Sequence, residues 1–188
     1  MGDNRGGAQA GRQAMKFPLI VLDFEASSLS TESYPIEVGV AVAARPEAPI
    51  DIWSSLIRPD KAWLAGNDWD PVAQEVHNIP ASSLTGGLPA HEVAARLNEI
   101  LGPVGHAYCD GGHYDGFWLK RLYKAAGMAP AFALWDIARL FMFERRLFRS
   151  FGALLAESDA PHRAGADAAR LCAALVKVLG GSPGRLRT

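Results

Sequence analysis

A short apolar run that ends in two acids constrains this chain more than any other stretch. The run covers residues 17–22 and leads directly into Asp23, Phe24 and Glu25. Its shortness and its β-branched residues predict a buried central strand rather than a helix. Because side chains alternate along a strand, Asp23 and Glu25 point to the same face. Two such carboxylates repel each other and lose hydration, and a divalent cation offsets both costs.

The acid-x-acid pattern is weak by itself. The chain holds 20 Asp and Glu residues among 188, and the same pattern occurs at residues 68–70 and 157–159. We interpret those two pairs as solvated loop residues or helix caps. The apolar strand that leads into Asp23 and Glu25 separates them from the other pairs and makes them candidate metal ligands.

Composition limits the class of protein. A chain of 188 residues that is 49% hydrophobic fits one domain with a full core. Its net charge of −1 gives no overall attraction to nucleic acid or membrane, so an anionic substrate needs local basic groups or bound metal. Cys109 and Cys172 lack metal-ligand spacing and are expected to be buried thiols. With no membrane-spanning stretch and no signal-peptide core, the sequence predicts a cytoplasmic protein with no membrane partner.

The order of the expected elements predicts an α/β domain. Residues 1–16 are expected to be a disordered tail, residues 17–180 the folded domain, and residues 181–188 a loose tail. Strands are expected at 17–25, 35–44 and 50–58 as an antiparallel meander, and at 106–109 and 132–135. Helices are expected at 70–77, 88–101, 115–127, 136–143, 151–157 and 163–179. Strands followed by alternating helices and strands favour a mixed sheet with helices packed on it.

Two later acids begin predicted helices. Asp115 follows a strand and a glycine turn, and Asp167 lies near the start of the last helix. His162 and Asp167 can contribute to one site if His162 lies on the loop that enters this helix. Pro161 favours this loop position. By themselves, the two acids are better explained as residues near helix N-termini that the helix dipole stabilises. His162 is then an ordinary loop histidine.

Three segments together resemble the motifs of the DEDDh 3′→5′ exonucleases. They are Asp-x-Glu at 23–25, Tyr-Asp-x-x-Trp-Leu at 114–119 and His-Arg-Ala-x-x-Asp at 162–167. Their order and spacing agree over residues 21–179. That group includes the proofreading subunit of bacterial replicative DNA polymerase and ribonuclease T. The resemblance implies a ribonuclease H-like fold, with a mixed five-stranded sheet and helices on both faces.

The resemblance also implies a chemistry. Asp23, Glu25, Asp115 and Asp167 would hold two Mg²⁺ or Mn²⁺ ions, which oxygen-only ligands favour over zinc. His162 would be the general base that deprotonates the attacking water. Hydrolysis at the 3′ end of single-stranded DNA or RNA would then release 5′-mononucleotides.

Substrate contacts are implied in the same way. Leu29 would wedge against the 3′-terminal base, and Ser28, Phe117 and His77 would line the groove. Periodicity alone explains Leu29 and Phe117 as core residues. The chain has Ala-Ser-Ser-Leu at 26–29 where the family often has Thr-Thr/Ser-Gly-Leu. It also has Asp-Gly at 110–111 in place of His/Ser-Asn. Since both segments line the groove in relatives, the choice between DNA and RNA stays open.

Other interpretations stay open as well. The chain could be a non-catalytic nucleic-acid-binding module or a polymerase-associated subunit, or an editing enzyme that acts on a small nucleotide. The complete set of acids and His162 favours the exonuclease. Two basic clusters, at 120–124 and 145–149, are either solvated helix faces or a phosphate-binding rim. Both a monomer and a homodimer are compatible with the sequence.

Overall fold

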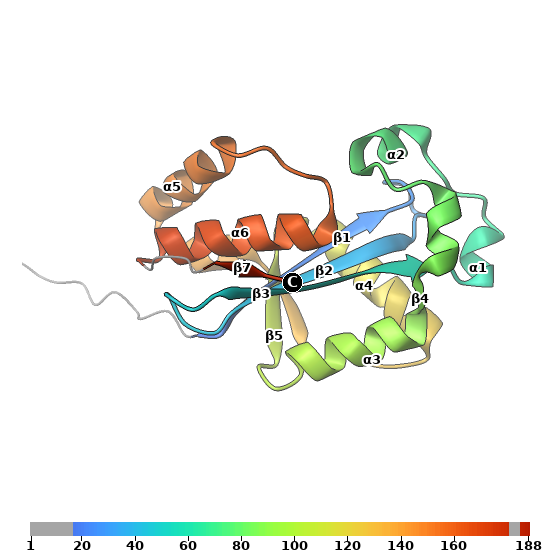
Figure 1. The fold of residues 1–188 in the computed structure, drawn as a ribbon, viewed down its shortest axis with the longest axis horizontal. Coiled ribbons are helices and arrows are strands. Elements are labelled where there is room, and N and C mark those ends of the chain that lie inside the picture. Colours follow the sequence, from blue (N-terminus) through green and yellow to red (C-terminus); the bar gives the residue numbers. More distant parts are fainter. Residues whose placement is uncertain (1–16, 181–184) are drawn as a thin grey trace, which may run out of the picture.

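The computed structural model describes residues 17–180 and 185–188. They form a mixed sheet with helices on both faces (Figure 1). Residues 1–16, expected to be a tail, and residues 181–184 lie outside the described part of the chain. Within that part, no helix combines the length and the hydropathy needed to cross a bilayer.

The predicted meander and the two later strands make up most of the sheet. Strands β1 (Leu19–Ala26), β2 (Pro35–Ala43) and β3 (Ile50–Arg58) pair antiparallel in sequence order. Strand β5 (His106–Cys109) pairs parallel with β1, and β6 (Ala133–Asp136) pairs parallel with β5. The carboxyl ends of β1, β5 and β6 therefore lie at one edge of the sheet.

Two short strands were not expected. Strand β4 (Leu88–Pro89) lies at the start of a segment predicted to be helical, and β7 (Leu186–Arg187) lies in the tail expected to be loose. Both pair parallel with β3. Free backbone groups on the outer side of β3 explain this pairing, since an edge strand accepts further strands.

Most predicted helices occur within two residues of their expected bounds, but the helix expected at 136–143 is a 3₁₀ helix at Ile137–Phe141. The α-helices are α1 (Lys61–Leu64), α2 (Pro71–His77), α3 (Ala90–Leu101), α4 (His113–Ala126), α5 (Arg145–Ala156) and α6 (Ala164–Val178). Within the described residues there are also two 3₁₀ helices, η1 (Ala81–Gly86) and η2 (Ile137–Phe141). Neither α1 nor η1 was predicted. Helix α5 begins earlier than expected because Leu147, Phe151 and Leu154 continue one apolar stripe toward the core.

Two apolar cores bury both faces of β1. Ile20, Leu22 and Phe24 pack with α3 and α4, whereas Leu19 and Val21 face α6. Figure 1 shows α6 on one side of the sheet and α3 on the other. Asp23 and Glu25 continue the series of Leu19 and Val21, so strand alternation directs them to the α6 face.

Gly39 of β2 lets α6 approach that face closely. Gly39 is the partner of Asp23 in the β1–β2 pair. A Cβ atom at this position would overlap the backbone of Ala164 and Gly165 at the start of α6. The missing side chain therefore allows the first turn of α6 to lie against the end of β1, where Asp167 can reach Asp23 and Glu25.

Candidate active site

The four predicted carboxylates come together at the carboxyl end of β1. Asp23, Glu25 and Asp167 each offer an oxygen within 4.8 Å of the others. Asp23, Asp110 and Asp115 form a second set with the same spacing. Asp23 belongs to both sets and lies between them. This arrangement suits two hard cations that share one carboxylate.

Asp115 is held inside the protein rather than displayed at a helix end. Its side chain is 1% exposed, and its Oδ2 accepts a hydrogen bond of 3.0 Å from the backbone N–H of Gly111. A Cβ at Gly111 would come within 2.7 Å of that oxygen. A residue kept only for the helix dipole would need no such burial, so the structure favours a role in the acidic cluster.

Asp167 lies in the first turn of α6 and is largely buried. Its Oδ2 accepts a hydrogen bond of 3.0 Å from the backbone N–H of Arg163. Its Oδ1 is 3.9 Å from Nη1 of Arg170, one turn later on the same helix. Asp167 therefore has one oxygen hydrogen-bonded to the loop before α6 and the other near the guanidinium of Arg170.

His162 lies on the loop that enters α6, as predicted. It is exposed and has a φ of 50°, which is unusual for a residue with a side chain. It lines a cleft of about 250 Å³ together with Asp23, Glu25, Asp167 and Arg170. The structure thus brings the predicted base and three predicted ligands to one cavity.

Asp23, Glu25 and Asp115 of this cluster have raised pKa values. Burial, followed by the charges of Asp115 and Glu25, raises the pKa of Asp23 well above its ordinary value. Burial and the neighbouring Asp167 raise the pKa of Glu25 to about 8. Burial and Asp110 raise the pKa of Asp115 to about 7. A bound divalent cation would stabilise the ionised carboxylates and lower these pKa values. The set of carboxylate donors therefore fits Mg²⁺ or Mn²⁺.

Three residues in or behind the site were missed at the sequence level. Asp110 follows β5 directly, and the motif resemblance places it in a groove-lining segment without making it a metal ligand. Arg170 lines the same cleft, while its Nε and Nη2 bind Ser158 Oγ at 2.9 Å and Leu155 O at 2.6 Å. Glu37 of β2 binds the side chain of Arg163, on the loop that carries His162. A parallel pairing of β5 with β1 was the signal that could have revealed Asp110, because it places both strand ends together.

A second, more apolar cleft lies beside the acidic one. It measures about 220 Å³, and Phe24 and Glu25 line both clefts. Its other walls are the loop after β1, helix α2 and Trp118 of α4. Leu29, which is 66% exposed, forms part of its rim.

The structure brings three of the four predicted substrate residues to this cleft. Ser28, Leu29 and His77 line it, whereas Phe117 lies outside both clefts and packs against the α3–α4 core. Consecutive residues on a helix point about 100° apart, and Trp118 takes the position expected for Phe117.

Two of these residues have their polar atoms directed inward. Ser28 is 6% exposed, and its hydroxyl donates to Asp68. His77 is 2% exposed, and its Nδ1 accepts a hydrogen bond of 3.0 Å from the N–H of Ile79. Its Nε2 has no partner among the described residues, and burial lowers the pKa of the ring. His77 is thus a neutral imidazole with one unused donor beside the cleft.

No protein-family model matches the sequence, and no curated protein matches it. A full-length 3′-exonuclease matches the fold with a TM-score of 0.66 and 15% identity, over 86% of this chain and 80% of that one. The nuclease domain of 3′hExo, a DEDDh family member bound to rAMP, matches with a TM-score of 0.64 and 15% identity, over 86% and 90%. Cell-death related nuclease 4 (CRN-4) matches with a TM-score of 0.61 and 14% identity, over 88% and 65%. The chain therefore has the fold of the DEDDh exonucleases, a ribonuclease H-like mixed α/β sheet with helices on both faces.

Proposed function

We propose that the chain is a metal-dependent 3′→5′ exonuclease that removes 5′-mononucleotides from single-stranded DNA or RNA. The observation that carries the proposal is the pair of carboxylate sets that share Asp23, with His162 on the rim of the same cleft. The fold of known 3′-exonucleases supports it. The narrower grouping with the bacterial proofreading subunit and ribonuclease T rests on the resemblance of the three motifs.

The metal ligands are proposed from the two carboxylate sets. Glu25 and Asp167 would hold one ion and Asp115 the other, with Asp23 shared and Asp110 close to the second. Two Mg²⁺ or Mn²⁺ ions, when bound, stabilise both the attacking and the leaving oxygen of a displacement at phosphorus. The raised pKa values of Glu25 and Asp115 support a cation at each set, because ionised acids packed this closely need one.

His162 is proposed as the base that takes the proton from the attacking water. An imidazole suits this role because it can accept a proton near neutral pH. Its exposed position on the cleft rim leaves room for a water and a phosphodiester. Arg170, the basic residue that lines the same cleft, is placed to bind a phosphate oxygen.

The apolar cleft is proposed to take the 3′-terminal nucleoside. Leu29, Val76 and Trp118 offer apolar surface for a base, and the buried ring of His77 forms part of the same lining. A nucleotide is a ligand of the neighbouring structure of 3′hExo, which was solved with rAMP. The shared residues Phe24 and Glu25 would bring the terminal phosphodiester next to the acids.

A strand-shortening assay tests the proposal. DNA and RNA strands of matched sequence, labelled at the 5′ end, are incubated with Mg²⁺, Mn²⁺ or EDTA, with the wild type beside Asp23→Ala. We expect a ladder that shortens from the 3′ end and disappears with EDTA and in the variant. Binding of either strand without shortening would contradict the proposal and favour the non-catalytic binding module.

A further inference from the structure

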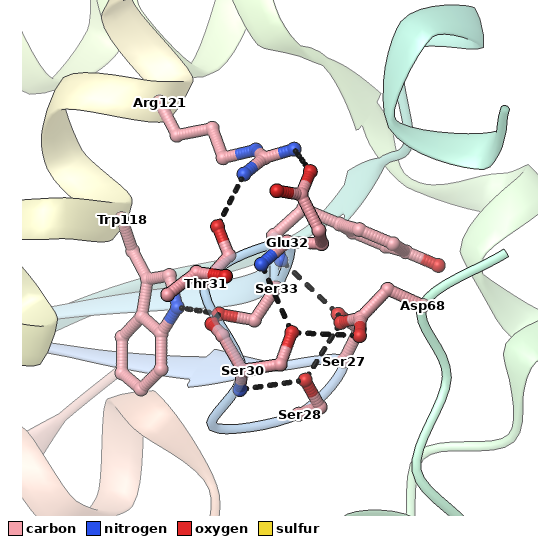
Figure 2. A network of polar contacts seen from close by, with 10 residues as sticks. Ser27, Ser28, Ser30, Thr31, Glu32, Ser33, Asp68, Trp118 and Arg121 are labelled. Carbon is pink, nitrogen blue, oxygen red and sulfur yellow. Dashed lines mark hydrogen bonds and ion pairs between the residues drawn. The ribbon is translucent and has the colours of Figure 1, made fainter. Parts of the chain in front are cut away.

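Asp68 joins three serine side chains of the loop after β1 (Figure 2). Its Oδ2 accepts hydrogen bonds from Ser27 Oγ at 3.1 Å and from Ser28 Oγ at 2.6 Å. Its Oδ1 accepts one from Ser30 Oγ at 2.7 Å. One carboxylate therefore fixes a loop that has no helix or strand of its own.

These bonds connect two walls of the apolar cleft. Ser28 and Leu29 belong to the loop wall, whereas Asp68 belongs to the segment that leads into α2 and its wall residues Val72 and Val76. Asp68 binds the residues on both sides of the exposed Leu29. A backbone hydrogen bond of 2.9 Å from the N–H of Asp70 to Ser27 O joins the same two segments at the base of the loop. The carboxylate of Asp68 adds the side-chain contacts nearest to the Leu29 rim.

The third wall is tied to the same loop from the other side. Trp118 of α4 lines the cleft and donates from Nε1 to Ser33 Oγ at 2.9 Å. Arg121, one turn later, donates from Nη1 to Thr31 O at 3.2 Å and lies 3.6 Å from Glu32. Figure 2 shows both side chains reaching the loop from α4, opposite Asp68. With α4 holding one end of the loop and the Asp70–Ser27 backbone bond holding its base, the contacts of Asp68 to Ser28 and Ser30 fix the part that carries Leu29.

Asp68 is well suited to hold three hydroxyl groups at once. Partial burial raises the pKa of its carboxyl, but the hydrogen bonds from Ser28, Ser30 and Ser27 and the charge of Arg121 more than offset this, so the pKa lies below its ordinary value. An ionised carboxylate accepts at both oxygens and forms stronger hydrogen bonds than a neutral acceptor.

We propose that Asp68 is a positioning residue that sets the width of the cleft for the 3′-terminal nucleoside and thereby the affinity for strand ends. The inference rests on the proposed exonuclease function and adds a residue outside its three motifs. Asp68 touches neither the acidic cluster nor the cleft itself, since it is absent from the linings of both clefts. Its loss therefore affects nucleoside binding more than bond cleavage.

The test compares two phosphodiesters. One is a single-stranded oligonucleotide, and the other is bis(p-nitrophenyl) phosphate, which has no nucleoside to fill the apolar cleft. For Asp68→Ala we expect KM for the oligonucleotide to rise about tenfold or more, with kcat nearly unchanged. Activity on bis(p-nitrophenyl) phosphate should stay at the wild-type level. Asp68→Asn should show a smaller rise, because its amide oxygen still accepts hydrogen bonds.

Two further variants separate positioning from folding. Ser30→Ala removes the single contact to Oδ1 from an exposed residue and should raise KM in the same direction but less. Asp51→Asn removes a surface carboxylate that pairs with Arg187 at 3.2 Å and lines neither cleft, and should leave KM unchanged.

An unchanged KM in Asp68→Ala, or an equal loss of rate on both substrates, would overturn the inference while leaving the proposed function intact. A wild-type protein that cleaves neither substrate would overturn the proposed function, and the inference with it.

Discussion

Glu25 of β1 and Glu37 of β2 stand directly opposite each other in the antiparallel pair. Like charges in this position are destabilising, and Arg163 offsets them. Its Nε and Nη2 bind the two oxygens of Glu37 at 3.0 and 2.6 Å, and Glu37 also accepts a hydrogen bond of 3.0 Å from the N–H of Ala164. The loop that carries His162 is thus fixed to the sheet beside the acidic cluster.

Removing this guanidinium should affect both stability and catalysis. Arg163→Ala leaves the buried Glu37 without its cation and should lower the free energy of unfolding by about 2 kcal/mol, as measured by urea denaturation in EDTA. Because His162 loses its fixed position, kcat should fall on the order of tenfold, with a smaller change in KM.

A surface pair provides the control for Arg163. Arg96→Ala breaks the exposed contact with Glu99 on α3 and should cost about 0.5 kcal/mol or less. Equal destabilisation by the two variants would contradict the structural role given to Arg163 and Glu37.

Metal binding should stabilise the protein more at high pH than at low pH. The folded-state pKa of Glu25 is raised from 4.5 to about 8, and that of Asp115 from 3.8 to about 7. Without metal, the folded state holds more protons than the unfolded state in this range. The stability from these groups is therefore complete below about pH 4 and is lost as the pH rises to about 8.

Thermal unfolding at pH 5.5 and pH 8, with EDTA or Mn²⁺, checks this expectation. The increase in Tm produced by Mn²⁺ should be larger at pH 8, where the carboxylates are ready to bind. Glu25→Gln should reduce the increase at both pH values. A larger metal effect at pH 5.5 would show that other groups bind the ion.

Asp110 should support metal binding without being essential. Asp110→Asn keeps Asp23 and Asp115 in place and should weaken Mn²⁺ binding by about tenfold, whereas Asp115→Asn should abolish strand shortening. Calorimetric titration with Mn²⁺ gives the affinity, and the strand assay gives the activity. Identical behaviour of the two variants would contradict this ranking.

The basic residues at the start of α5 should bind the substrate strand upstream of its end. Arg145, Arg146 and Arg149 are exposed, as is Phe148 among them. Changing the three arginines to Ala should raise KM and reduce the slope of log KM against log salt by about 2. The double change of Lys120 and Lys124 to Ala on α4 serves for comparison. An unchanged slope in the α5 variant would contradict the interpretation of these arginines as a phosphate-binding rim.

Local patterns predicted much of this architecture. The alternation of β1 placed Asp23 and Glu25 on one face, and Asp70, from a pair interpreted as loop residues or helix caps, is the N-cap of α2. The loop position of His162 also followed from Pro161.

Features that depend on distant contacts were not accessible in this way. Glu37 resembled an ordinary strand residue because its partner lies 126 positions later. The role of Asp110 depends on the parallel pairing of β5 with β1, which brings the ends of the two strands together and which the sequence does not show. The choice between Phe117 and Trp118 depended on the rotational phase of α4, which begins two residues earlier than predicted.

Release of the 3′-terminal nucleotide distinguishes an exonuclease from a non-catalytic binding module. A single strand labelled at its 3′-terminal nucleotide is incubated with Mn²⁺ and either the wild type or Asp23→Asn, and the products are separated by size. We expect the wild type to release labelled 5′-mononucleotide and the variant, which lacks the carboxylate common to both sets, to release none. Absence of labelled mononucleotide with the wild type, or release by Asp23→Asn at the wild-type rate, would contradict this expectation.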